Sequence, residues 1–238
     1  MTPLPAPIAD FALPLVLFLA LLLDWRHGET RYFHPLVGFG KLGQQLEKRL
    51  NRQHYQAALT RLFGCIAWCL LVLPLSAIYF LLQSDAWLFV LLDCFVLYLA
   101  IGLNSLKEHA LNIYKPLREN ELEQARQAVA MIVSRNTQEL NNTQISRATV
   151  ESVLENGHDA VIASLFYYTV GGAPLVILHR LANTLDAMWG YKSERFIHFG
   201  WCAAKMDDLL GWPSAKASAL LYGLAGSKNL SCLKQAIK

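Results

Sequence analysis

Two long stretches that hold one charged residue between them decide what this chain can fold into. Leu62–Leu82 holds twenty-one residues with no charged side chain, and Ala86–Leu103 holds eighteen with Asp93 as its one charge. A helix needs about 20 apolar residues to cross the hydrocarbon core of a bilayer. Both stretches therefore predict membrane-spanning helices, and the short "QSD" between them predicts a tight helical hairpin.

A third apolar stretch, Phe11–Leu23, comes near the start of the chain. A cleaved signal peptide carries positive charge before its apolar core, whereas Arg26 and Arg31 follow this one. Charged residues make up only 16% of the chain, against about 25% in an ordinary soluble domain. We therefore predict an all-α, multi-pass helical membrane protein, with residues 1–238 forming a single domain.

The basic residues fall into three blocks that predict the topology. Seven Lys and Arg lie between Asp24 and Arg61, six between Asn104 and Asp159, and eight from His179 to Lys238. The hairpin of 62–103 returns to its starting side, so the first two blocks share a compartment. The positive-inside rule identifies that compartment as the cytoplasm. With a net charge of +3 and no basic run interleaved with aromatics, nucleic-acid binding has no support.

Residues 160–178 form a further uncharged stretch whose path has two interpretations. A single crossing would leave the third basic block outside the cell, against the positive-inside rule. Gly171, Gly172 and Pro174 lie in this stretch, and they are unfavourable in a continuous helix. We favour a broken or re-entrant pair of half-helices that returns to the cytoplasm, with a plain span as the alternative.

Cytoplasmic helices are predicted for 104–158, where polar residues accompany a helical apolar pattern. Arg147, Glu151, Glu155 and Asp159 then recur every four residues. Each step of four advances about 40° beyond a full turn, so these groups form one drifting stripe on a helix. Two interpretations stay open: a surface helix with an Arg147–Glu151 ion pair, or a carboxylate cluster for magnesium with an arginine for phosphate.

A second polar cluster follows the apolar stretch, in "NTLDAMWGY" and "AAKMDDLLGWP". Asn183 and Asp186 lie within one helical turn, and Asp207 and Asp208 are adjacent, with Lys205 just before them. Adjacent carboxylates repel each other, which indicates either a metal-bound phosphate site or a solvated helix end.

Two single residues are also open to structural or functional interpretations. His34 precedes Pro35 in a juxtamembrane loop, where a histidine is either structural or a ligand. Asp93 lies in the middle of a predicted span, where an acid either meets a structural partner or takes part in chemistry.

Several short runs together resemble a known family. They are "HPLVGFGKL", "SRNTQEL", "ISRATVESVLENGHDAVIASLF", "GGAP", "NTLDAMWGY" and "FGWCAAKMDDLL", in that order. The chain resembles the CobD/CbiB family, the adenosylcobinamide-phosphate synthases, most densely over 125–210. The resemblance implies a multi-pass enzyme of the bacterial inner membrane, with most polar loops cytoplasmic. It also implies an acid–amine ligase that joins aminopropanol, or its phosphate, to adenosylcobyric acid in an ATP-dependent amide-forming reaction.

Such a reaction needs magnesium for the nucleotide, cations for phosphates and a base for the ammonium proton. The expected cofactor is therefore Mg²⁺, with ATP as co-substrate. The expected partners are the corrinoid, the amine, the lipid bilayer and other membrane enzymes of cobalamin assembly. Our hypothesis for the site takes Glu151, Glu155 and Asp186 as catalytic, His34, Arg135, Arg147, Asn156, Asn183 and Lys205 as substrate- or phosphate-binding, and Asp159, Asp207 and Asp208 as metal ligands.

The chain also departs from the family pattern. The family's "RD" is replaced by Arg135-Asn136, which removes a carboxylate. The family continues into a further C-terminal part with an "H-x-SPNAG" segment, whereas this chain stops at "KNLSCLKQAIK", so we expect that part to be missing. These departures favour the alternative of a non-catalytic regulatory or assembly membrane protein. A transporter ranks last, because no inverted repeat is visible.

Overall fold

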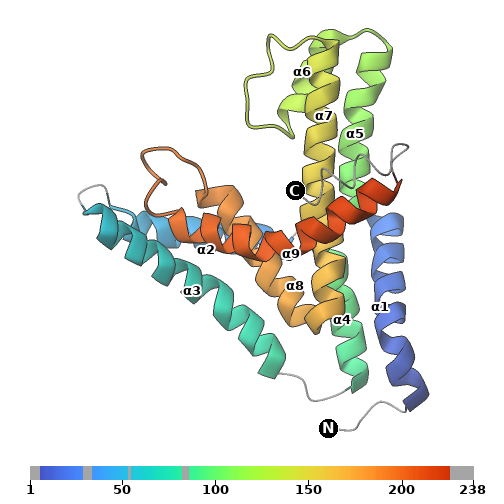
Figure 1. The fold of residues 1–238 in the computed structure, drawn as a ribbon, viewed down its shortest axis with the longest axis vertical. Coiled ribbons are helices and arrows are strands. Elements are labelled where there is room, and N and C mark those ends of the chain that lie inside the picture. Colours follow the sequence, from blue (N-terminus) through green and yellow to red (C-terminus); the bar gives the residue numbers. More distant parts are fainter. Residues whose placement is uncertain (1–5, 29–33, 53–54, 82–85, 226–238) are drawn as a thin grey trace.

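The computed structural model describes residues 6–28, 34–52, 55–81 and 86–225, and within these ranges the chain forms helices and loops without a strand (Figure 1). The predicted all-α class is confirmed. The helices are α1 (Ala6–His27), α2 (Pro35–Leu50), α3 (Ala57–Leu81), α4 (Ala86–Ala100), α5 (Leu103–Arg118), α6 (Leu122–Ala130), α7 (Asn142–Asn156), the π-helical turn η1 (Gly157–Ile162), α8 (Ala163–Trp189) and α9 (Trp201–Ala225).

Three helical stretches are long and apolar enough to cross a membrane, which confirms the multi-pass helical class. They are Ala57–Tyr79, Leu88–Arg118 and Asn142–Trp189. The first two contain most of the predicted spans, and the third contains the broken stretch 160–178. Phe11–Leu23 lies in α1, whose crossing of the membrane stays a prediction, and the predicted "QSD" turn lies outside the described residues.

The helices are not parallel to one another, as Figure 1 shows. Helices α1, α4 and α7 follow the long axis of the molecule, whereas α2 and α9 lie across it. Phe39 of α2, Trp68 of α3 and Trp189 of α8 are buried in one apolar cluster. A Cβ atom at Gly64 of α3 would lie 2.0 Å from the Phe199 carbonyl oxygen, so glycine is needed where α3 meets the segment before α9.

The predicted break in 160–178 is confirmed. Gly171 (φ −155°, ψ 22°) and Gly172 (φ 68°, ψ −164°) are not helical. Figure 1 shows that the chain runs along the long axis through α7, η1 and the first part of α8, then reverses. After the break, the second part of α8 returns towards α2 and α9, as the re-entrant interpretation expects.

Replacing Gly172 by alanine is expected to destabilise the protein by about 1–3 kcal/mol, because this backbone region is open essentially to glycine alone. The cost is conformational rather than steric, since the nearest atom to an added Cβ is Pro174 Cδ at 3.7 Å. Thermal unfolding in detergent measures it. Gly38→Ala in α2 is the control, because nothing lies within 4 Å of its added Cβ. Equal unfolding temperatures for the two variants would contradict the strain.

Helices α5 and α6 and the start of α7 form a separate unit, called the cap below, at one end of the long axis (Figure 1). Ile113, Val129 and Ile145 are buried in its own apolar cluster. The apolar pattern that starts at Leu122 continues in the sequence to Val133, but α6 ends at Ala130. The following residues form a loop instead, and this loop faces the site described below.

Helices α7 and α8 are joined by a π-helical turn rather than by a continuous α-helix. Asn141 and Gln144 start α7 with a capping box, in which each side chain bonds the other's backbone N–H at 2.9 Å. The turn η1 follows at Gly157. A Cβ at Gly157 would lie 2.9 Å from Tyr222 Oη, so glycine lets η1 pack closely against α9.

Asp93 on α4 has two structural partners. Tyr79 of α3 donates its hydroxyl to Oδ1 at 2.5 Å, and Tyr168 of α8 donates to Oδ2 at 2.8 Å. An acid within the membrane is normally stabilised by such partners. These hydrogen bonds join three helices and favour the structural interpretation of Asp93.

Candidate functional site

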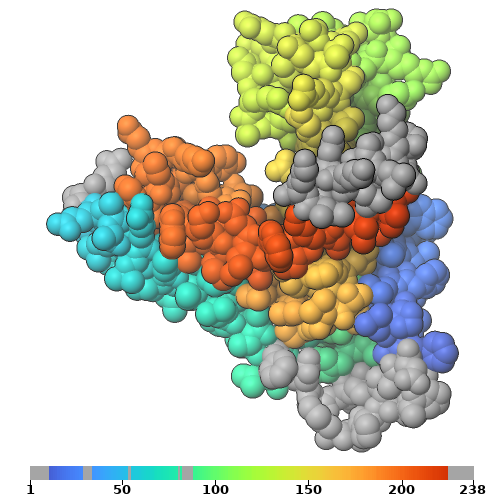
Figure 2. Space-filling view, viewed as in Figure 1, coloured from blue at the N-terminus to red at the C-terminus, as the bar shows by residue number. Residues whose placement is uncertain are grey.

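A cavity of about 1040 Å³ lies where the cap meets α8 and α9. Figure 2 shows a notch in the surface between the cap and the part of the chain around the end of α8. The polar lining residues are Ser105, His109, Ser134, Arg135, Glu151, Ser152, Glu155, Asn156, Asp159, Arg180, Asn183, Asp186, Tyr191 and Asp207. The structure thus brings together the three predicted catalytic acids, the predicted ligands Arg135, Asn156 and Asn183, and the predicted metal ligands Asp159 and Asp207.

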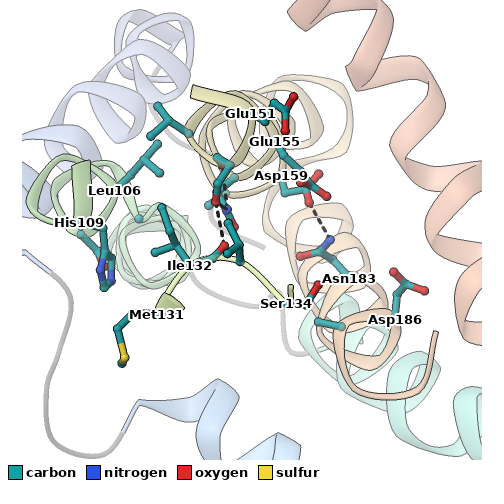
Figure 3. A pocket seen from close by; sticks show the side chains of 18 of the residues that line it. Leu106, His109, Met131, Ile132, Ser134, Glu151, Glu155, Asp159, Asn183 and Asp186 are labelled. Atoms are coloured by element: carbon teal, nitrogen blue, oxygen red, sulfur yellow. Dashed lines mark hydrogen bonds between the residues drawn. The ribbon is translucent and has the colours of Figure 1, made fainter. Parts of the chain in front are cut away.

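The acidic stripe faces this cavity. Glu151, Glu155 and Asp159 line it, and Figure 3 shows their side chains gathered on the same side as Asn183 and Asp186. Between Glu155 and Asp159 the helix becomes a π turn, which closes with i→i+5 hydrogen bonds and so holds one more residue than an α turn. The drift expected from a regular α-helix therefore does not apply to Asp159.

Glu151 is occupied by two arginines. Arg135 and Arg147 each donate to its carboxylate at 2.9 Å. Arg135 belongs to the loop after α6 and lines the cavity, whereas Arg147 is 82% exposed and lies outside the lining. A carboxylate that holds two guanidinium groups is a poor base, so Glu151 is better suited to fixing Arg135 beside the cavity.

Asp159 is held from two sides. Nδ1 of His158 lies 2.8 Å from its Oδ1, and Asn183 Nδ2 donates to its Oδ2 at 3.2 Å. Both Asn183 and Asp186 come from the returning part of α8. The break at Gly172 is therefore what brings these side chains back to the acidic stripe of α7 and η1.

Asp207 reaches the same space from α9. Burial, and then the carboxylates of Asp186 and Asp159, raise the pKa of Asp207 to about 7. Its Oδ1 is buried and receives no hydrogen bond from the described residues. The carboxylates of Asp159 on η1, Asp186 on α8 and Asp207 on α9 are therefore close enough to affect one another's ionisation.

Asp207→Asn is expected to stabilise the protein at pH 8 more than at pH 5. The folded-state pKa of Asp207 is raised above its ordinary 3.8, so its ionisation costs stability as the pH rises from about 4 to 7. This rise of the Asp207 pKa from 3.8 to about 7, discounted by half for solvent screening, corresponds to about 2 kcal/mol at pH 8. Thermal unfolding of both proteins at the two pH values tests this. An equal gain at both would contradict the raised pKa.

Besides Arg147, three further predicted ligands lie outside the cavity lining. Asp208 points away from Asp207 and pairs with Lys205 at 2.9 Å, with both side chains more than half exposed. Neighbouring residues on a helix face different directions, which separates the two acids. His34 does not line the cavity; it caps α2, its Nδ1 accepting from Leu36 N at 3.3 Å.

The structure adds Arg180, Tyr191 and His109, which the sequence reasoning missed. Arg180 precedes Asn183 by three residues and Asp186 by six, so one helix face carries all three. That spacing was readable in "HRLANTLD". His109 lies on the opposite side of the cavity from the acids, close to Met131 (Figure 3).

The acids suit a magnesium ion that arrives with phosphates. No three His, Cys, Asp or Glu side chains in the described ranges stand close enough to form a metal site by themselves. Mg²⁺ is usually bound by one or two carboxylates plus substrate phosphates. Asp159 and Asp207 fit that arrangement, because both line the cavity and Oδ1 of Asp207 receives no hydrogen bond from the described residues.

Comparison with known proteins identifies the same family through a family model and through individual relatives. A family model described as "CobD/Cbib protein" matches residues 17–238. This match reaches the last residue, so the expected loss of the family's C-terminal part is not borne out by it. No solved structure matches the chain.

Individual relatives cover most of the chain. "Cobalamin biosynthesis protein CobD" of Stutzerimonas stutzeri is 50% identical over 210 residues, which are 87% of this chain and 68% of the relative. The protein of the same name from Chromobacterium violaceum is 48% identical over 89% of this chain and 69% of its own length. "Probable cobalamin biosynthesis protein CobD" of Pyrococcus furiosus is 37% identical over 92% and 74%.

Proposed function

The chain belongs to the CobD/CbiB protein family, and we propose that it is a membrane enzyme of cobalamin biosynthesis. Its proposed reaction joins aminopropanol, or its phosphate, to adenosylcobyric acid through an ATP-dependent amide bond. The names of its relatives support the pathway. The resemblance of its sequence motifs to the family suggests the reaction.

One observation carries the proposal: aspartates from three elements and two arginines line a single cavity. Asp159, Asp186 and Asp207 supply the acids, and Arg135 and Arg180 supply the cations. Arginine binds phosphate oxygens through two parallel hydrogen bonds, whereas carboxylates bind magnesium or accept protons. Amide formation driven by phosphoryl transfer uses all three of these abilities.

The reaction balances in two steps. A carboxylate oxygen of the corrinoid attacks the γ-phosphorus of ATP, ADP leaves, and an acyl phosphate forms. The amine nitrogen then attacks the acyl carbon; the C–N bond forms, the C–O bond to phosphate breaks, and inorganic phosphate leaves. The nitrogen loses a proton to a base at this stage.

Roles for individual residues follow from their positions. Arg135 and Arg180 would hold phosphate oxygens, and Asp186 would accept the proton from the amine. Asp207 and Asp159 would hold Mg²⁺ together with the phosphates. Bound Mg²⁺ neutralises the charge that phosphoryl transfer develops.

The location of the cavity agrees with a substrate supply from the cytoplasm. The cavity lies between the cap, at one end of the long axis, and the level of that axis at which α2 and α9 lie (Figure 1). These elements carry much of the chain's Lys and Arg, which the positive-inside rule places in the cytoplasm. We therefore propose the bacterial inner membrane, with the cavity facing the cytoplasm.

Complementation tests the proposal. The chain is expressed in a strain that lacks the synthase, and cobyric acid is supplied as the only corrinoid. Cobalamin-dependent growth is expected. No growth from a protein that demonstrably reaches the membrane would overturn the catalytic proposal and favour a regulatory or assembly role.

A further inference from the structure

A hydrogen-bonded chain connects Asp159 to α9 behind the cavity. His158 Nδ1 lies 2.8 Å from Asp159 Oδ1, and His158 Nε2 lies 3.0 Å from Ser214 Oγ. Ser214 Oγ in turn lies 3.0 Å from the Gly211 carbonyl oxygen. The three side chains belong to η1 and α9, two elements that are far apart in the sequence.

The direction of the first bond is fixed by chemistry. An ionised carboxylate has no hydrogen to give, so Nδ1 of His158 must carry the hydrogen that Asp159 accepts. Nε2 then either donates to Ser214 or accepts from it, and a hydroxyl can do both. The ring orientation is therefore held from both nitrogens.

Neither His158 nor Ser214 reaches the substrate space. The Ser214 side chain is fully buried, and His158 is 18% exposed and does not belong to the cavity lining. Any effect of these two residues on the reaction must therefore pass through Asp159 or through α9.

Helix α9 carries Ser214 and Asp207 on one face. The two are seven residues apart, which is nearly two full turns. The Ser214–His158 contact thus fixes how α9 is rotated about its own axis relative to η1. Asp207 lies on the same face of α9 as this contact. The close approach of Gly157 to Tyr222 is a second contact between the same two elements.

We infer that His158 is a positioning residue: through Ser214 it sets the register of α9 against η1, so that Asp207 and Asp159 face the cavity together. This inference rests on the proposed function, since it concerns the acids of that site. The ligand that the aligned acids receive is a magnesium–phosphate group.

Two His158 variants distinguish the two ring nitrogens, and two serine variants of α9 complete the test. In His158→Asn the amide nitrogen replaces Nδ1, and in His158→Gln it replaces Nε2. Ser214→Ala removes the contact to α9. Ser218→Ala is the matched control, because Ser218 is one turn further along α9, is buried, and makes no hydrogen bond through its hydroxyl to any described residue.

In the amide-forming assay, His158→Asn and Ser214→Ala, which both lose the contact to α9, are expected to lower kcat about 10- to 100-fold, with KM for ATP changed less than about threefold. His158→Gln, which keeps an amide nitrogen at the position of Nε2, should recover most of the loss of His158→Asn, and Ser218→Ala should match the wild type. Unchanged kcat in both His158→Asn and Ser214→Ala, in an active protein, would overturn the positioning role while leaving the proposed function intact.

Thermal unfolding in detergent gives a second test that needs no activity. His158→Ala and Ser214→Ala should shift the unfolding temperature non-additively, so that the double variant unfolds close to the less stable single variant. His158→Ala combined with Ser218→Ala should be additive. If the wild type forms no amide, the proposed function fails, and the same unfolding data still decide the contact. Additive shifts for the first pair would overturn the inference.

Discussion

Asp186→Asn is expected to lower the turnover of the proposed synthase by about 100-fold or more, without altering membrane insertion. A positioned base contributes about 10²- to 10⁴-fold to such a reaction, and the amide of asparagine cannot accept the proton. Purified protein, incubated with adenosylcobyric acid, aminopropanol or its phosphate, ATP and Mg²⁺, would be assayed for the corrinoid amide. Because the change removes charge but not volume, the fold should be preserved.

The position of the Asp186 carboxylate depends on Gly190, the residue that follows α8. A Cβ at Gly190 would lie 2.0 Å from Asp186 Oδ1 and 2.8 Å from its carbonyl oxygen. Alanine at position 190 would therefore displace the carboxylate while leaving it in the chain. A loss of turnover in Gly190→Ala, with the carboxylate still present, would show that its placement matters as well as its charge.

Asp208→Asn is the matched control for Asp186→Asn. Asp208 carries the same charge on α9, but it is paired with Lys205 on the exposed surface. Exposed ion pairs of this kind contribute little. Turnover within about twofold of the wild type is expected. If Asp186→Asn retained full turnover, or if both variants lost it equally, Asp186 would not be the base.

Much of the fold was predictable from local chemistry. Long uncharged stretches predicted helices α3 and α4, because a bilayer allows few other structures. Gly171 and Gly172 predicted the break in α8, because their backbone freedom is costly in a continuous helix. The regular spacing of Glu151, Glu155 and Asp159 placed them on one side, and the structure confirms that all three line one cavity.

The partners across the site were not predictable from spacing. Arg135 donates to Glu151 from a loop sixteen residues earlier in the chain, and no local sequence pattern predicts that contact. Asp207 and Asp208 looked equivalent in the sequence, yet the packing of α9 turns the first towards the cavity and the second towards solvent. The π turn at Gly157 also changes the direction in which Asp159 points. The four-residue spacing could not predict this, because it assumes a regular α-helix.

Arg180 is the clearest case of a readable signal that the sequence reasoning did not use. Arg180, Asn183 and Asp186 recur at three-residue spacing on α8, and all three line the cavity. The sequence reasoning selected Arg147 instead, because it belonged to the more conspicuous stripe. The structure places Arg147 on the exposed side of Glu151 and outside the cavity lining.

Arg180→Met is therefore expected to lower kcat/KM for ATP by about 100-fold or more. Arg180 lies half-buried among the acids of the cavity, where a fixed positive charge stabilises the transferring phosphoryl group better than it would in water. Methionine keeps an unbranched apolar stem in place of the arginine methylenes, so the loss reports the missing guanidinium charge more than lost packing. Steady-state kinetics at varied ATP, with the other substrates saturating, measures it.

The contrast with Arg147→Met makes the Arg180 prediction decisive. Arg147 is also an arginine beside an acid, but its side chain is 82% exposed, and its ion pair with Glu151 should contribute less than about 1 kcal/mol. We expect Arg147→Met to keep kcat/KM within about threefold of the wild type. If Arg147→Met lost as much activity as Arg180→Met, the phosphate-binding cation would belong to the stripe on α7. If Arg180→Met were fully active, the cavity described here would not be the place where the nucleotide reacts.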